Sequence, residues 1–170
     1  MSAETTTAGL TLTSADIAED EPIAEMYTFN GFGCAGGNIS PALSWSGAPP
    51  GTKSFALTCY DPDAPTGSGF WHWVVFNIPA TVGGLPRGAG DPQSAAAPKG
   101  AVQSRTDYGV TGYGGPCPPP GDKPHRYQFT IFAVDVDKLD AEEQSSAAVV
   151  GFNLHFHTLA KRTLTGLYGR

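Results

Sequence analysis

Charged residues are scarce in this sequence, and no stretch of it is strongly basic. Asp, Glu, Lys and Arg together make up 15% of the 170 residues, whereas about 25% is usual for a globular domain. The net charge is −6, and Lys and Arg never occur in a run. Because nucleic-acid binding depends on a basic surface, we do not expect a nucleic-acid partner.

Long apolar segments are also missing. No apolar run approaches the roughly 20 residues that a membrane-spanning helix needs. The first residues, MSAETTTAGLTLTSADIAED, lack the basic start and apolar segment of a signal peptide. We therefore expect a cytoplasmic protein without a membrane span.

Cysteine is rare, and its positions form no known motif. Cys34, Cys59 and Cys117 are odd in number, and none belongs to the CxxC pairs of zinc sites. Free thiols in a reducing cytoplasm are the simpler interpretation. Cys117 is interpreted as a small apolar side chain that fills space. Neither a metal ion nor another cofactor is expected.

Glycine, proline and aromatic residues are abundant instead. The chain has 22 Gly and 15 Pro, dispersed without a period, together with nine Phe, six Tyr and three Trp. The aromatic content argues against disorder, and the dispersed turn formers favour many short strands. The length fits one domain over residues 1–170, with residues 1–9 expected to be flexible.

Four segments show either the apolar–polar alternation or the continuous apolar run that is typical of strands. They are residues 10–13, 53–60, 71–78 and 125–136. In the second of these, Phe55, Leu57 and Cys59 share one face. The third, WHWVVFNI, is apolar on both faces and is typical of a central, doubly covered strand. Regular alternation would place His72 on the face that carries Val74.

The C-terminal part changes to a helical pattern. Apolar residues between positions 156 and 167 recur at intervals of three and four, which predicts an amphipathic helix. A shorter helix is expected near residues 145–152. His155 and His157 either cap or pack this region, or form an HxH metal pair if it is a strand. Strands followed by helices suggest a β-sandwich with C-terminal helices.

The stretch DPDAPTGSGFWHW, residues 61–73, concentrates acids and a histidine between two predicted strands. Pro residues fix the backbone that carries Asp61 and Asp63. His72, on an otherwise apolar strand, needs a hydrogen-bond partner, and these carboxylates are the nearest candidates. Ordinary turn chemistry with a structural histidine is the alternative interpretation.

A second stretch, GYGGPCPPPGDKPHRY at residues 112–127, combines a stiff Gly- and Pro-rich loop with the start of a strand. The two-residue period places His125 and Tyr127 on one side and Arg126 on the other. The glycines could leave backbone N–H groups free to form an anion-binding nest. A carboxylate beside an imidazole favours the imidazolium, a strong donor to an oxyanion. Together the two stretches predict a pocket for phosphate or carboxylate.

Several motifs in this order resemble the phosphatidylethanolamine-binding protein family, and most closely its short bacterial branch of Raf-kinase-inhibitor-like proteins. They are DPDAP with WHW, GYGGPCPP with HRY, NISPALSW, PPGTKSFAL and GFNLHFHTLA. The resemblance implies a mainly β fold, a sandwich of two antiparallel sheets with Greek-key topology and C-terminal helices. It also implies a small anion pocket formed by Asp61, Asp63, His72, Gly115, Pro116, Pro118, Pro119, His125 and Tyr127, with Trp71 as a wall.

Three functions follow from this resemblance and from the residues. The leading hypothesis is a regulatory or inhibitory module that binds a phosphate-bearing headgroup or another small anion. Its protein partner, a kinase or a protease, is unidentified, and the resemblance also allows a homodimer. The alternative is a hydrolase that uses the Asp and His side chains on a phosphate ester, although neither G-x-S-x-G nor HExxH occurs. In the third, the pocket is vestigial and the protein acts through its surface.

Overall fold

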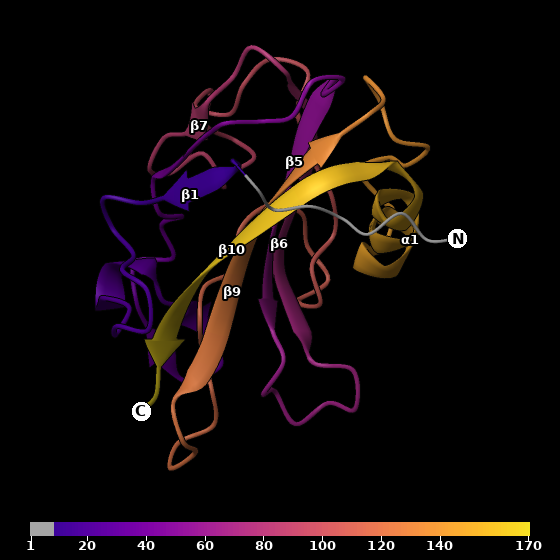
Figure 1. The fold of residues 1–170 in the computed structure, drawn as a ribbon. Helices are drawn as coiled ribbons and strands as arrows, with labels where there is room; N and C mark the ends of the chain where they lie inside the picture. Colours follow the sequence, from indigo (N-terminus) through magenta and orange to yellow (C-terminus); the bar gives the residue numbers. More distant parts are fainter. Residues whose placement is uncertain (1–8) are drawn as a thin grey trace.

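A five-stranded antiparallel sheet forms the centre of the protein (Figure 1). The computed structural model describes residues 9–170, so the prediction for the flexible N-terminus concerns mainly residues outside the described ones. The strand order is β10-β9-β5-β6-β8. Their bounds are Ser54–Asp61 for β5, Phe70–Pro79 for β6, Val102–Gln103 for β8, His125–Val134 for β9 and Thr158–Tyr168 for β10.

A three-stranded sheet packs against one face of this sheet. It has the order β1-β4-β7 and comprises Thr11–Thr13, Leu43–Ser46 and Gly84–Leu85. The main core lies between the two sheets, where Trp45 of β4 and Leu85 of β7 join Leu57, Trp73 and Phe129 of the large sheet. A small hairpin of β2, Asn30–Gly31, and β3, Cys34–Ala35, follows the short 3-10 helix Glu25–Tyr27.

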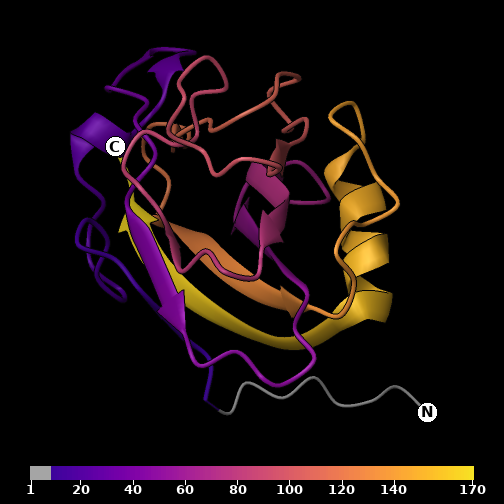
Figure 2. The same cartoon turned by 90° about the horizontal axis from the view of Figure 1, so that it is seen from above.

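The helix α1, at Ala147–His157, covers the other face of the large sheet (Figure 2). Val150 and Leu154 pack against Val74 and Phe76 in a second core cluster. The Ser146 side chain caps the helix by accepting a hydrogen bond from the Val149 N–H. In the last turn, His157 pairs with Asp135 at 2.8 Å instead of lying on a strand as part of an HxH pair.

An irregularity in the pairing of β5 with β6 decides which way His72 points. Cys59 pairs with Trp73 and Tyr60 pairs with Trp71, so His72 is the extra residue of a β-bulge. The expected face for His72, shared with Val74, is therefore wrong. His72 turns towards the side of Tyr127, and Val74 lies on the helix-covered face.

The predicted helix over residues 156–167 is also wrong, because residues 158–167 belong to the strand β10 and only 156–157 are helical, at the end of α1. The strand pairs with β9 from end to end, and Thr163 meets Thr130 across the pair through their hydroxyls at 2.8 Å. Thr is β-branched and favours strands. Apolar residues spaced four apart, such as Ala160 and Leu164, satisfy a period of two as well as a helical period.

The end of β10 is also joined to the N-terminal segment. Ile23 N–H donates to the Leu167 carbonyl at 2.7 Å, and Leu167 N–H donates to the Glu21 carbonyl at 3.0 Å. A side chain at Gly166 would lie 2.6 Å from the side chain of Ile23, so this crossing requires glycine. The segment at residues 20–23 thus lies along the end of β10.

The predicted fold class is confirmed: the protein is mainly β, with antiparallel sheets and a helix near the C-terminal end. One helix is present in the described residues where two were expected. The Greek-key sandwich stays a prediction. Across residues 9–170, we find no helix with the length and apolar character needed to cross a membrane.

Candidate functional site

A cavity of about 360 Å³ opens at one end of the large sheet. Asp61 ends β5, Phe70 begins β6 and His125 begins β9, and antiparallel pairing brings these ends together. The lining side chains come from the two predicted stretches and from two further loops. They are Phe32, Asp61, Ala64, Pro65, Thr66, Phe70, His72, Asp107, Tyr108, Cys117, Pro118, Pro119, His125 and Tyr127.

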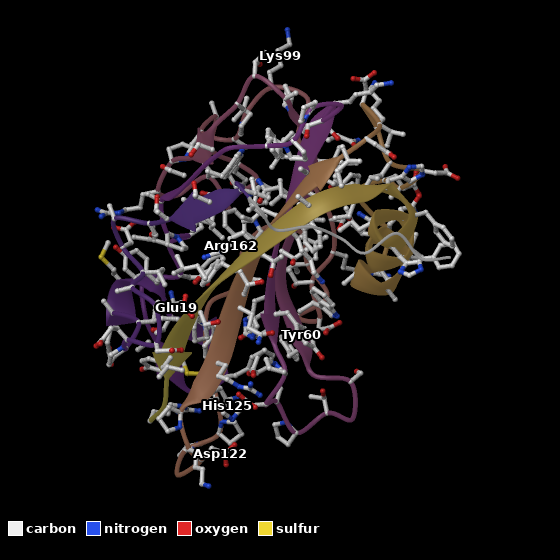
Figure 3. The ribbon with its side chains drawn as sticks, viewed as in Figure 1. Glu19, Tyr60, Lys99, Asp122, His125 and Arg162 are labelled. Carbon is white, nitrogen blue, oxygen red and sulfur yellow. A yellow bond between two sulfur atoms is a disulfide. The ribbon has the colours of Figure 1, made fainter. Side chains whose placement is uncertain are left out.

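His125 is held between two carboxylates at the edge of this cavity. Figure 3 shows it at the start of β9, close to Asp122. Its Nδ1 lies 2.8 Å from Oδ2 of the buried Asp61, and its Nε2 lies 3.0 Å from Oδ2 of Asp122. Burial lowers the pKa of His125, but the hydrogen bonds to the two acids outweigh it, so the pKa lies above its ordinary value. The imidazolium form is thereby favoured.

His72 has the opposite character. Its Nδ1–H donates to the Gly114 carbonyl at 2.7 Å. Burial is the main cause that lowers the pKa of His72 from 6.5 to about 4, so the ring is neutral at neutral pH. Since Nδ1 carries the proton, Nε2 is left as a hydrogen-bond acceptor. The ring contacts those of Tyr108 and Tyr127 edge-on.

Asp107 and Tyr108 are cavity residues that the sequence patterns did not single out. Asp107 and Trp71 bond reciprocally: Trp71 N–H donates to Asp107 Oδ2 at 2.8 Å, and Asp107 N–H donates to the Trp71 carbonyl at 3.0 Å. The Tyr108 hydroxyl donates to the Gly115 carbonyl at 2.8 Å. Both residues belong to an irregular loop, so no periodicity marks them.

Asp63 and Trp71, which were predicted to belong to the pocket, point away from the cavity. Asp63 forms an ion pair with Arg126, with Oδ1 and Nη2 2.9 Å apart. This guanidinium is the main cause that lowers the pKa of Asp63 to about 2. Trp71 faces the helix-covered side of the sheet, where its ring packs on that of Tyr60. Trp71 therefore contributes backbone contacts near the cavity but no wall.

The Pro-rich loop contributes Pro118 and Pro119 to the lining, while Gly115 and Pro116 are buried behind it. The backbone amides near its start are already bonded. Gly114 N–H donates to the His72 carbonyl at 2.9 Å, and Gly115 N–H donates to Asn38 Oδ1 at 2.8 Å. These two glycines therefore do not offer free N–H groups for an anion nest, contrary to the expectation.

The expectation of three free thiols is wrong as well. Cys34 of β3 and Cys117 of the Pro-rich loop form a disulfide, with their Cα atoms 6.0 Å apart and a separation of 83 positions in sequence. Cys117 is thus a covalent link at the cavity and not a space-filling thiol. Cys59 keeps a free thiol, buried in the main core.

The polar groups of the cavity are richer in acceptors than in cations. Asp61 and Asp107 line it, and Asp122 lies behind His125, which is the cationic side chain among them. Apolar rings of Phe70, Tyr108 and Tyr127 fill much of the remaining wall. Within residues 9–170, no group of three or more His, Cys, Asp or Glu side chains is arranged to hold a metal ion.

Comparison with known proteins assigns the family. The family model described as "Phosphatidylethanolamine-binding protein" matches residues 13–169. The chain belongs to the phosphatidylethanolamine-binding protein family. Among its relatives in this family is the "UPF0098 protein YbcL" of Escherichia coli, which is 52% identical over 95% of this chain and 88% of the relative. The "UPF0098 protein YbhB" of the same organism is 51% identical over 92% of this chain and 98% of the relative.

Solved structures of this family share the fold. The crystal structure of Escherichia coli YbcL, described as a new member of the mammalian family, superimposes with a TM-score of 0.94 over 96% of this chain and 99% of that chain, at 52% identity. The phosphatidylethanolamine-binding protein of Plasmodium vivax has a TM-score of 0.64 at 16% identity, covering 99% of this chain and 89% of that chain. The fold is therefore shared even with a protein that has only 16% of its residues in common with this chain.

Proposed function

We propose that this protein is a binding module for a small phosphate-bearing headgroup, and that ligand binding serves to regulate or inhibit another protein, such as a kinase or a protease. The observation that carries the proposal is the convergence of Asp61, His125 and His72 on one largely apolar cavity. Its volume of about 360 Å³ suits a headgroup, since ligand cavities begin at about 300 Å³. The family to which the chain belongs is named after such a lipid.

The charges favour a zwitterionic headgroup over a bare phosphate ion. The hydroxyl of Tyr127 supplies a donor for phosphate oxygens. The imidazolium of His125, whose two N–H groups bond to Asp61 and Asp122, supplies a positive charge that attracts them. Asp61, Asp107 and Nε2 of His72 supply acceptors for an ammonium group. Because carboxylates outnumber cations, a phosphate without an accompanying ammonium group meets net repulsion.

Calorimetric titration of phosphoethanolamine and of inorganic phosphate tests this proposal. The wild type should bind phosphoethanolamine more tightly. Asp107→Asn keeps the acceptor for Trp71 N–H but removes a charge, so the affinity for phosphoethanolamine should fall about tenfold while that for phosphate does not fall. Asp137→Asn, an exposed acid outside the cavity, is the matched control and should change neither affinity.

Two results would redirect the proposal. If neither compound binds saturably to the folded wild type, the headgroup function is wrong. If inorganic phosphate is released from phosphoethanolamine and His125→Gln abolishes the release, the hydrolase alternative holds, since the buried Asp61–His125 pair at 2.8 Å would then act in proton transfer.

A further inference from the structure

The hairpin of β2 and β3 carries a phenylalanine that forms part of the cavity wall. Phe32 lies at the tip between the two strands and lines the cavity, although 78% of its surface is exposed. Its ring stacks with those of Phe29 and Tyr108, at centroid distances of 5.7 and 5.9 Å. The mouth of the cavity on this side is thus an exposed apolar ring.

The backbone of this tip is strained. Phe32 has a φ of 50° and Gly33 a φ of 84°, as in a tight hairpin turn with two left-handed residues. A bulky side chain is unfavourable in that region, by about 1 kcal/mol or more. An exposed ring on a strained backbone keeps its position only if other contacts hold it.

The disulfide is the strongest of these contacts. Cys34 follows the strained turn, and its bond to Cys117 fastens the tip to the cavity-lining loop. Besides the disulfide and the stacking of the Phe32 ring with Phe29 and Tyr108, the contacts of the tip are weak. The two strands pair over two residues each, and Arg170 Nη1 reaches the Gly33 carbonyl only at 3.5 Å.

The loop on the other side of the bond is fixed independently. The Gly115 carbonyl accepts from the Tyr108 hydroxyl at 2.8 Å, and the Pro118 carbonyl accepts from Arg170 Nε at 2.7 Å. If the disulfide opens, the loop and the rest of the cavity keep their contacts, and the hairpin tip is the part that is released.

We propose that the Cys34–Cys117 disulfide is a reducible site that controls the mouth of the cavity. In the oxidised form it holds Phe32 against the cavity; in the reduced form the hairpin tip moves away and headgroup binding weakens. The part of this proposal that concerns the ligand rests on the proposed function. The release of the hairpin does not depend on it.

The chemistry is thiol–disulfide exchange with a small thiol or dithiol. A thiolate of the reductant attacks one sulfur, the bond between the two cysteines breaks, and the other sulfur leaves as a thiolate. The second thiol of a dithiol, or a second molecule of a monothiol, then resolves the mixed disulfide. Two electrons pass to the protein, two protons end on Cys34 and Cys117, and the reductant becomes a disulfide. Both cysteines are half-buried and Cys117 lines the cavity, so a small reductant can reach them.

Hydrogen exchange and calorimetry on the oxidised and dithiothreitol-reduced protein test the proposal. A Cys59→Ala background leaves the pair as the only thiols that can be alkylated. At short exchange times, when β5 and β9 stay protected in both redox states, reduction should speed amide exchange of residues 30–35 about tenfold or more. It should also weaken phosphoethanolamine binding about tenfold, and reoxidation should restore both properties.

Two variants distinguish control of the cavity mouth by the disulfide from a purely stabilising role of the bond. The double variant Cys34→Ser, Cys117→Ser should behave as the reduced protein with or without dithiothreitol. Phe32→Ala keeps the disulfide but removes the ring, so its affinity should already be low and reduction should not lower it further. Equal exchange of residues 30–35 in both redox states would overturn the proposal, as would thiols that dithiothreitol exposes only after unfolding. If phosphoethanolamine does not bind the oxidised protein, the proposed function fails, and the exchange data alone decide on hairpin release.

Discussion

At the scale of single residues, His72 and His125 line the same cavity but differ in their surroundings. His72 meets a backbone carbonyl and aromatic rings, so burial depresses its pKa. His125 meets two carboxylates, which outweigh burial and raise its pKa. One cavity thus contains a neutral acceptor and a favoured cation, a combination that suits a ligand with both kinds of polar group.

The depressed pKa of His72 predicts a specific acid sensitivity. The folded pKa of about 4 lies below the ordinary 6.5, so stability that is present above 6.5 is lost as the pH falls towards 4. The loss attributable to this residue is about 3 kcal/mol. Denaturant unfolding at a series of pH values should show it in the wild type, and His72→Gln should lack that part of the slope. An equal slope in both proteins would contradict the assignment.

The contribution of His125 to the free energy of unfolding should depend on pH with the opposite sign. Because its folded pKa is raised, its contribution is complete below the unfolded value of 6.5 and declines as the pH rises through the folded pKa. His125→Gln should therefore cost more stability in mildly acidic than in alkaline solution, measured by the same unfolding series. A cost that does not vary with pH would show that the Asp61–His125 contact is not an ion pair.

At the scale of secondary structure, the helix α1 contains a glycine whose replacement by alanine should stabilise the protein. Gly151 lies inside the helix, and a Cβ added there would meet no atom within 4 Å. Gly151→Ala should therefore raise the free energy of unfolding by about 0.5–1 kcal/mol. Ser146→Ala, which removes the N-cap, should lower it by about 1 kcal/mol. Chemical denaturation of the two variants measures both effects, and a destabilising Gly151→Ala would contradict the open space.

The long strands were predictable from sequence, and the errors have physical causes. Residues 53–60 and 125–136 alternate regularly, and the structure places β5 and β9 there with the expected faces. The error over β10 arises because its apolar positions fit two periods, and only pairing with β9 decides between them. The orientation of His72 depends on a bulge, which adds one residue without a sequence signal.

The candidate site was predictable only where its residues belong to strands. Asp61, His125 and Tyr127 follow from strand ends, and the cavity unites them. Asp107 and Tyr108 come from an irregular loop that only the folded chain brings there. The Cys34–Cys117 bond joins residues 83 positions apart, and such a pairing cannot be read from spacing.

At the scale of the whole molecule, the disulfide constrains the unfolded chain as well as the cavity. Its closed loop includes β4 to β8 and spans 83 residues. Removing the bond with Cys34→Ser and Cys117→Ser should lower the free energy of unfolding by about 2–4 kcal/mol. Denaturant titration under non-reducing conditions measures the loss. Cys59→Ser lies outside the bond and serves as the comparison for a buried thiol; a double variant as stable as the wild type would contradict the expected constraint.

The joining of β10 to the N-terminal segment has a consequence for synthesis of the chain. On the ribosome, the segment around Ile23 emerges early. Its hydrogen-bond partner Leu167 belongs to β10, which emerges after all the other described strands. Ile17 and Ile23, which pack at Gly166, stay without this cover until then. Such distant contacts close slowly. Newly made chains therefore pass through a stage in which these apolar side chains are open to chaperones or to neighbouring chains.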